Sequence, residues 1–215
     1  GANRLATVDG PLADDTIEYG YDELGRSATR SVYGGTEAAW SYDELGRIET
    51  ASDVLGAFTY AYDGVTSRLS SISYPNGQET SLAYHDETQG RDLATVTNLG
   101  PGEALISAFG YTYDAEGRIL TRSTTLPCDA ESLTDVAEHD DTGELIEFTT
   151  GGQPTGGTPN AYTYDLAGNR ETLQAGESDL VTFHHDSVNK LTSWDQGTAS
   201  ATLTYDENGN LEGNG

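Results

Sequence analysis

The chain has 215 residues, with 36 Asp and Glu against 10 Lys and Arg, and a formal net charge of −26 at pH 7. Affinity for phosphate backbones and anionic lipid comes from clustered Lys and Arg, so this charge argues against nucleic-acid partners and membrane-surface roles. The chain also has no apolar run of about 18 residues, the length of a membrane-spanning helix, so we expect no membrane insertion.

A six-residue motif organises the chain. It reads Tyr-Asp-Glu-Leu-Gly-Arg at 21–26 and again at 42–47, and looser copies begin at 62, 85, 113, 139, 164, 185 and 205. A near-fixed period of this length is typical of a repeat architecture. We predict a single array of about nine copies over residues 1–215. The residues expected to define the structural repeat are Tyr21, Asp22, Gly25, Arg26, Tyr42, Asp43, Gly46, Arg47, Tyr113, Asp114, Gly117, Arg118, Tyr164, Asp165, Gly168, Tyr205, Asp206 and Gly209.

Each copy predicts a strand followed by a tight turn. Aromatic residues two apart, such as Tyr19 and Tyr21, indicate a strand with one aromatic face. The following Asp can accept a hydrogen bond from a backbone N–H two or three residues on, and the Gly suits a left-handed backbone. We therefore predict a type I turn closed by a glycine bulge. In the eighth copy Asn189 replaces Gly, and Asn tolerates positive φ better than most residues.

Two copies depart from this turn and two regions from the spacing. The third and fourth copies, 63–68 and 86–91, are one residue longer, so we predict another turn type there. We interpret residues 121–137 as an enlarged loop, with a short helical turn from Asp129, and residues 151–159 as a long hairpin loop; a linker is the alternative reading of 151–159. Because loops often carry function, 121–137 is the first place to look for a contact surface.

A second strand and a second turn complete each copy, which predicts a meander of roughly eighteen strands. An open sheet that wide must twist and curl. The fold class we predict is all-β, an antiparallel β-hairpin meander of repeats that curls into a spiral or barrel-like shell segment. Candidates for the second turns are 9–11, 34–35, 75–77, 100–102, 151–157, 175–176 and 196–197.

No catalytic, cofactor or metal site is predicted. His85, His139 and His185 each stand directly before an aspartate, and we interpret them as substitutes for the motif tyrosine. His184 and His185 could bind a metal in principle, but neighbours on a strand point to opposite faces. Residues 206–210 resemble the start of a calcium loop, yet the Gly comes two places early for an EF-hand. There is no Gly-x-Ser-x-Gly, phosphate loop or His-Glu-x-x-His, and the single cysteine, Cys128, cannot form an internal disulfide.

The copies at 21–26, 113–118, 164–169 and 205–210 resemble the YD repeats of the Rhs family, which includes Tc toxin shell components, bacterial wall-associated proteins and teneurins. The resemblance implies a β-sheet that spirals into a large hollow shell. In polymorphic-toxin members the shell encloses a C-terminal toxin and ends in an Asp-Pro-x-Gly-Leu motif linked to self-cleavage. No Asp-Pro occurs here, so those residues cannot be carried over. We interpret the chain as a wall segment of a longer polypeptide.

The function we predict is therefore a non-enzymatic shell segment of a bacterial, secreted or surface-delivered protein. Its partners would be the rest of its own chain or an enclosed polypeptide cargo such as a C-terminal toxin. One alternative is a cell-surface adhesion or carbohydrate-binding module whose exposed tyrosines stack on sugars. Another is a self-assembling extracellular fibre or sheath, because open sheet edges can add a neighbouring strand.

Overall fold

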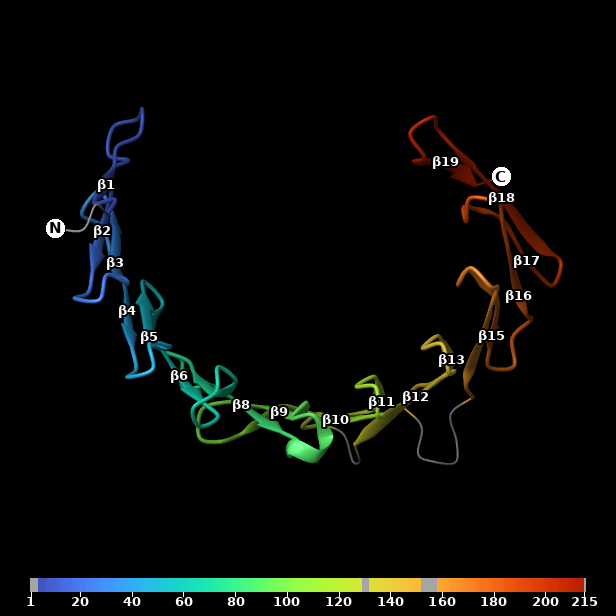
Figure 1. Ribbon diagram of the computed structural model, residues 1–215, viewed down its shortest axis with the longest axis horizontal. Helices are drawn as coiled ribbons and strands as arrows, with labels where there is room; N and C mark the ends of the chain where they lie inside the picture. Colours follow the sequence, from blue (N-terminus) through green and yellow to red (C-terminus); the bar gives the residue numbers. More distant parts are fainter. Residues whose placement is uncertain (1–3, 129–131, 152–157, 215) are drawn as a thin grey trace. The chain divides into compact units, whose positions relative to one another are not determined.

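The computed structural model describes residues 4–128, 132–151 and 158–214. It contains nineteen strands, each paired antiparallel with the next along the chain, and one 3₁₀ turn, η1 (Glu87–Gln89), so the predicted all-β hairpin meander is confirmed (Figure 1). The strands are β1 Thr7–Val8, β2 Ile17–Tyr21, β3 Ser27–Val32, β4 Ala38–Tyr42, β5 Ile48–Asp53, β6 Gly56–Tyr62, β7 Leu69–Ser73, β8 Glu79–Tyr84, β9 Leu93–Leu99, β10 Leu105–Tyr113, β11 Ile119–Thr125, β12 Leu133–His139, β13 Leu145–Thr149, β14 Asn160–Tyr164, β15 Arg170–Ala175, β16 Val181–His185, β17 Leu191–Gln196, β18 Ala199–Tyr205 and β19 Leu211–Asn214.

The chain divides into two compact units. The first comprises residues 1–109 and 126–128, and the second comprises residues 110–125 and 129–215. Within the described parts of both units only Gly100, Asp135, Ala137 and Ala201 are buried, and no large side chain is fully buried. The sheet therefore has no second layer packed against it, and its stability must come from turns and from contacts between neighbouring hairpins.

The motif turn is a three-residue loop closed by a left-handed glycine, as predicted. In the first copy the Asp22 N–H donates to the Arg26 carbonyl (3.0 Å) and the Gly25 N–H donates to the Asp22 carbonyl (2.9 Å). Gly25 has φ +84°. This is the hydrogen-bond pattern of a type I turn followed by a glycine bulge. The same two bonds recur in the turns that begin at Asp43, Asp114, Asp140, Asp165, Asp186 and Asp206.

The eighth copy confirms why glycine occupies this place. Asn189 has φ +63°, and its N–H donates to the Asp186 carbonyl (3.0 Å) as the glycines do. The longer third and fourth copies form other turns, also as predicted. In the third, the Asp63 N–H donates to the Arg68 carbonyl, which closes a four-residue loop. The fourth contains the 3₁₀ turn η1, capped by the Asp86 side chain.

The structure corrects the alignment of the fourth copy. His85 was expected in the tyrosine position, but Tyr84 ends the strand and pairs with Leu93, as Tyr21 pairs with Ser27 in the first copy. The His85 N–H closes the turn by donating to the Asp92 carbonyl (2.8 Å). His85 thus stands where other copies have the turn aspartate, because the 3₁₀ turn lengthens the loop behind it.

The loops also differ from the sequence prediction. The enlarged loop at 121–137 is wrong in extent, because β11 continues to Thr125 and β12 begins at Leu133. A strand in a sheet without a core needs no apolar face, so a Ser- and Thr-rich run can pair as well as any other. The helical turn expected from Asp129, and most of the 151–159 loop, fall outside the described residues. The sequence also missed the two-residue turn Val54-Leu55 that joins β5 to β6.

The turn geometry predicts the effect of substitutions at Gly117, which has φ +81° and open space where a Cβ would lie. Gly117→Ala should lower the free energy of unfolding by about 1–2 kcal/mol, the cost of a left-handed L-residue. Gly117→Asn should cost clearly less, because Asn tolerates this conformation. Urea unfolding monitored by circular dichroism would measure both. Equal costs for Ala and Asn would contradict the assigned backbone constraint.

Candidate functional site: a tyrosine–arginine ladder between hairpins

The motif aspartate organises its own turn and fixes the residue that follows the glycine. In the second copy Asp43 Oδ1 accepts hydrogen bonds from the N–H groups of Leu45 (3.0 Å) and Arg47 (2.9 Å). Its Oδ2 accepts a third from Arg47 Nε (2.7 Å). The first and fifth copies repeat the ion pair at 2.6 and 2.5 Å. Where Asn replaces Arg, in the seventh and ninth copies, its Nδ2 makes the equivalent bond, at 2.9 and 2.8 Å.

These hydrogen bonds keep the turn carboxylates ionised. For Asp43, partial burial acts to raise the pKa, but bonds from the Arg47 side chain and backbone, together with its charge, outweigh burial and hold the pKa below its usual value. For Asp165 the bonds from the side chain and backbone of Asn169 lower the pKa. An ionised carboxylate accepts hydrogen bonds only, which matches the donors arranged around it.

In several copies the motif arginine extends from its own turn to the tyrosine of the next hairpin. The guanidinium carbon of Arg26 lies 4.2 Å from the ring centroid of Tyr42, and Arg47 lies at the same distance from Tyr62. Both distances allow a cation–π attraction. Arg47 Nη1 also donates to the carbonyls of Gly64 (2.9 Å) and Thr66. Further pairs are Arg4 with Tyr21 (5.5 Å), Arg68 with Tyr84 (5.6 Å) and Lys190 with Tyr205 (4.9 Å).

The tyrosine hydroxyl makes the second connection between hairpins. Tyr42 Oη donates to the carbonyl of Ser27 (2.7 Å), the residue directly after Arg26 in the preceding copy. Burial raises the pKa of Tyr62 and of Tyr164, so these hydroxyls stay protonated and able to donate. The same bond joins Tyr21 to Leu5, Tyr62 to Ile48, Tyr84 to Leu69, Tyr164 to Leu145 and Tyr205 to Leu191.

The backbone explains why a side chain is needed at this point. In the β2–β3 hairpin the register shifts between Gly20 and Tyr21, which marks a β-bulge in β3. Pairing between β3 and β4 consists of two residue pairs and ends at Thr29 and Ala39. The Ser27 carbonyl lies beyond that end, and the Tyr42 hydroxyl supplies the donor that the neighbouring strand does not. We call the repeated Arg-to-ring and hydroxyl-to-carbonyl contacts the Tyr–Arg ladder.

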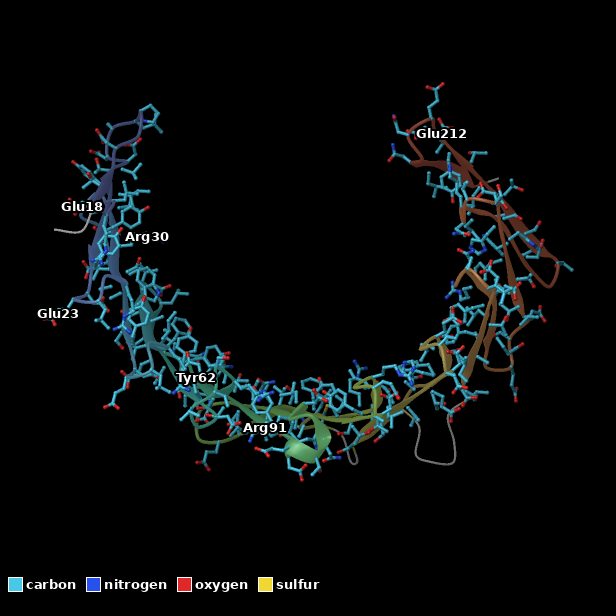
Figure 2. All side chains as sticks on the ribbon, in the orientation of Figure 1. Glu18, Glu23, Arg30, Tyr62, Arg91 and Glu212 are labelled. Atoms are coloured by element: carbon cyan, nitrogen blue, oxygen red, sulfur yellow. The ribbon has the colours of Figure 1, made fainter. Side chains whose placement is uncertain are left out.

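The other face of the sheet carries small hydroxyl side chains. The side-chain hydroxyl oxygens of Ser41 and Thr50 lie 2.7 Å apart across β4 and β5. The pairs Thr112 with Thr121 and Thr163 with Thr172 make the same hydroxyl contact at the same distance. Residues opposite each other share a face, so Arg30 lies on the face of Tyr19 and Glu18 on the other. Figure 2 shows Arg30 and Glu18 projecting to opposite sides of the β2–β3 hairpin.

The structure thus brings together motif residues of successive copies, a contact that sequence reasoning missed. The available signal was the recurrence of a tyrosine 14–19 residues after the carbonyl that it reaches, in the six copies that make this bond. Asp206 is engaged by the Asn208 and Asn210 N–H groups, as in any other turn. His184 contacts Asp195 (2.7 Å), and Cys128 is exposed. Among the described residues no group of three or more His, Cys, Asp or Glu is placed to hold a metal.

Comparison with known proteins shows which family this chain resembles. The family model described as Teneurin YD-shell matches residues 86–215, more than half of the chain. No curated protein matches the sequence. Within the described residues no helix is both long and apolar enough to span a bilayer.

Two solved structures share the fold. The TcdB2-TccC3 structure without its hypervariable C-terminal region aligns with a TM-score of 0.57 and 14% identity over 91% of this chain. The TcdB2-TccC3-Cdc42 structure aligns with a TM-score of 0.57 and 13% identity over 93% of it. The chain spans 12% of the length of each of these chains. The repeated turns, the Tyr–Arg ladder and the family match together establish that this chain belongs to the Teneurin YD-shell family.

Proposed function

We propose that this chain forms part of the wall of a hollow YD shell and that its aromatic face is turned toward an enclosed polypeptide. The observation that carries the proposal is the Tyr–Arg ladder, which joins successive hairpins across one face of a sheet that has no core of its own. A wall needs this property, because it must hold its form over a wide area with a single layer.

The hairpin tips give further support. The second loop position of several motif turns carries an exposed apolar side chain, with Leu24 76% exposed and Val188 73% exposed. Apolar side chains repeated along one edge of a sheet favour contact with other parts of a larger assembly. In the proposed shell the partners of these tips are further repeats of the same polypeptide. The role is structural rather than catalytic, and we place it in a secreted or surface-delivered protein.

The ladder argues against the sugar-binding alternative. Stacking on a sugar needs free aromatic faces and free hydroxyl groups. Here a guanidinium lies over the rings of Tyr42 and Tyr62, and their hydroxyls are bonded to backbone carbonyls. These rings are already used to join hairpins, so we do not propose carbohydrate binding.

A labelling experiment tests whether the aromatic face is enclosed in the shell. Ala51 faces Trp40 and Phe58, whereas its neighbour Ser52 lies on the hydroxyl face, and the two residues are similarly half-buried. In the complete natural polypeptide with Cys128→Ser, we expect a bulky maleimide to label Ser52→Cys rapidly and Ala51→Cys only after the shell is opened by denaturant. Equal labelling of both cysteines in the intact particle would contradict the proposal.

A double-mutant cycle tests the ladder itself. Arg47→Gln and Tyr62→Leu, made singly and together, should show a coupling free energy of about 0.5–1 kcal/mol in urea unfolding, as expected for a cation–π contact. Arg47→Gln combined with Tyr21→Leu, a tyrosine on β2 that contacts Arg4 instead, is the matched control and should be additive. Equal coupling in both cycles would show that the effect is general rather than a ladder contact.

The turn carboxylates predict how the wall responds to acid. Their pKa values are lowered by folding, so the unfolded chain binds more protons just below pH 4, the usual range for Asp. The contribution of these carboxylates to the free energy of unfolding should therefore stay constant above about pH 4 and decline as the pH falls through the folded-state pKa values. Urea unfolding at a series of pH values measures this slope, and Asp43→Asn should reduce it. An unchanged slope in that variant would contradict the assigned role of Asp43.

A further inference from the structure

Arg30 occupies a place in the repeat where most copies have an uncharged residue. It lies on the aromatic face opposite Tyr19, and it pairs with Ala38 on β4, the first strand of the next hairpin. The corresponding pairs between other hairpins carry no charge: Ala51 with Phe58, Ile72 with Thr80, Phe148 with Asn160, Leu173 with Val181 and Trp194 with Ala201. A guanidinium at this place therefore needs an explanation.

One other copy has an arginine at this place, and that arginine has a carboxylate partner. Arg122 stands in the fifth copy where Arg30 stands in the first, four residues after the motif arginine. It pairs across the strands with Asp135, whose Oδ2 accepts hydrogen bonds from Arg122 Nε (3.0 Å) and Nη2 (2.5 Å). Asp135 and Ala38 both stand four residues before the tyrosine position of their copies. Arg30 thus meets a methyl group where Arg122 meets a carboxylate.

Arg30 and two aromatic neighbours have donor groups that the chain does not use. Among the described residues, the side chains of Arg30, Tyr19 and Trp40 make no hydrogen bond, ion pair or ring contact. By contrast, the motif residue Arg26 is already paired with Asp22 (2.6 Å). A guanidinium offers five N–H donors, and a phenol and an indole offer one donor each. Together they suit an acceptor that carries negative charge.

The three side chains border one cavity. It has a volume of about 340 Å³ and is also lined by Ser27, Tyr42 and Ile48, so Arg30 is the one charged residue of its lining. Aromatic rings and an aliphatic side chain beside a guanidinium lower the local dielectric, which strengthens its attraction for an anion. Repulsion from the distant part of the net charge of −26 is screened beyond about 8 Å at physiological ionic strength.

We propose that this cavity binds the carboxylate of an acidic side chain of the enclosed polypeptide. The cargo then supplies to Arg30 the partner that Asp135 supplies to Arg122. The planar guanidinium of Arg30 donates to the carboxylate, and the Tyr19 hydroxyl and Trp40 Nε1–H supply further donors. The methylene groups of a glutamate side chain pack on the Trp40 ring. This inference rests on the proposed function, because it takes the aromatic face to be the enclosed one.

The test titrates the 215-residue chain with N-acetylglutamate amide and, as its uncharged match, N-acetylglutamine amide. The Trp40 indole N–H signal is followed by NMR. We expect saturable shifts and about fivefold tighter binding of the glutamate probe, the upper end for a solvent-exposed ion pair. Arg30→Gln should remove this preference. Arg91→Gln removes the same charge from an arginine outside the cavity and should keep it.

The missing carboxylate can also be supplied within the chain. Ala38→Asp places an acid opposite Arg30, as Asp135 lies opposite Arg122, and should abolish the preference for the glutamate probe. Ala39→Asp adds the same charge one residue away on the other face of the sheet, and should leave the preference unchanged. Acetate should bind more weakly than the glutamate probe, because it lacks the methylene and peptide groups.

Equal affinity for the two probes, or the same loss of preference in Arg91→Gln as in Arg30→Gln, would overturn the proposal. Acetate binding as tightly as the glutamate probe would assign the cavity to free carboxylates and overturn the polypeptide as its occupant. If Ala38→Asp does not fold, the two arginine variants decide the question alone. The titration does not require an enclosed space, so its failure would leave the labelling test of the shell unaffected.

Discussion

The bond from a tyrosine hydroxyl to a backbone carbonyl of the preceding hairpin is the contact on which this architecture depends. Register shifts mark a bulge in eight of the motif hairpins, and a bulge leaves backbone groups without a strand partner. The hydroxyls of Tyr42 and Tyr62 donate hydrogen bonds to the Ser27 and Ile48 carbonyls. The same rings are held by the arginines of the preceding turns, so one side chain satisfies the backbone and fixes the spacing of neighbouring hairpins.

The ladder also explains why the two faces differ so strongly in composition. Aromatic rings and guanidinium groups are large enough to bridge the space between hairpins, so they occupy one face. The opposite face carries short side chains that pair across adjacent strands, such as Ser41 with Thr50, together with charged side chains such as Glu18. Part of the excess of acidic residues that gives the net charge of −26 lies in the turns. There carboxylates such as Asp22 accept hydrogen bonds from backbone N–H groups and from arginine side chains.

The parts of the fold that depend on short stretches of sequence were predictable, and those that depend on contacts between copies were not. The turn requires Asp, Gly and Arg within six residues, so its geometry, and even the left-handed Asn189, follow from the motif. The link from Tyr42 to Ser27 spans 15 residues and has no local signal. The sequence motif aligned His85 with the tyrosines of other copies. In the structure His85 occupies the position of the turn aspartate, because the loop of this copy is longer. The polar end of β11, which continues to Thr125, was missed because a sheet without a core imposes no apolar alternation.

The dependence of each hairpin on its immediate neighbours has a consequence for how such chains change over evolutionary time. The β4–β5 hairpin, for example, carries on one side the Tyr42 hydroxyl and ring that contact its predecessor, and on the other the Arg47 guanidinium and Ile48 carbonyl that contact its successor. A copy can therefore be duplicated or removed as a unit while both new junctions remain chemically complete. Lengthening by whole repeats leaves these local contacts unchanged, so the length of the array is open to selection in discrete steps.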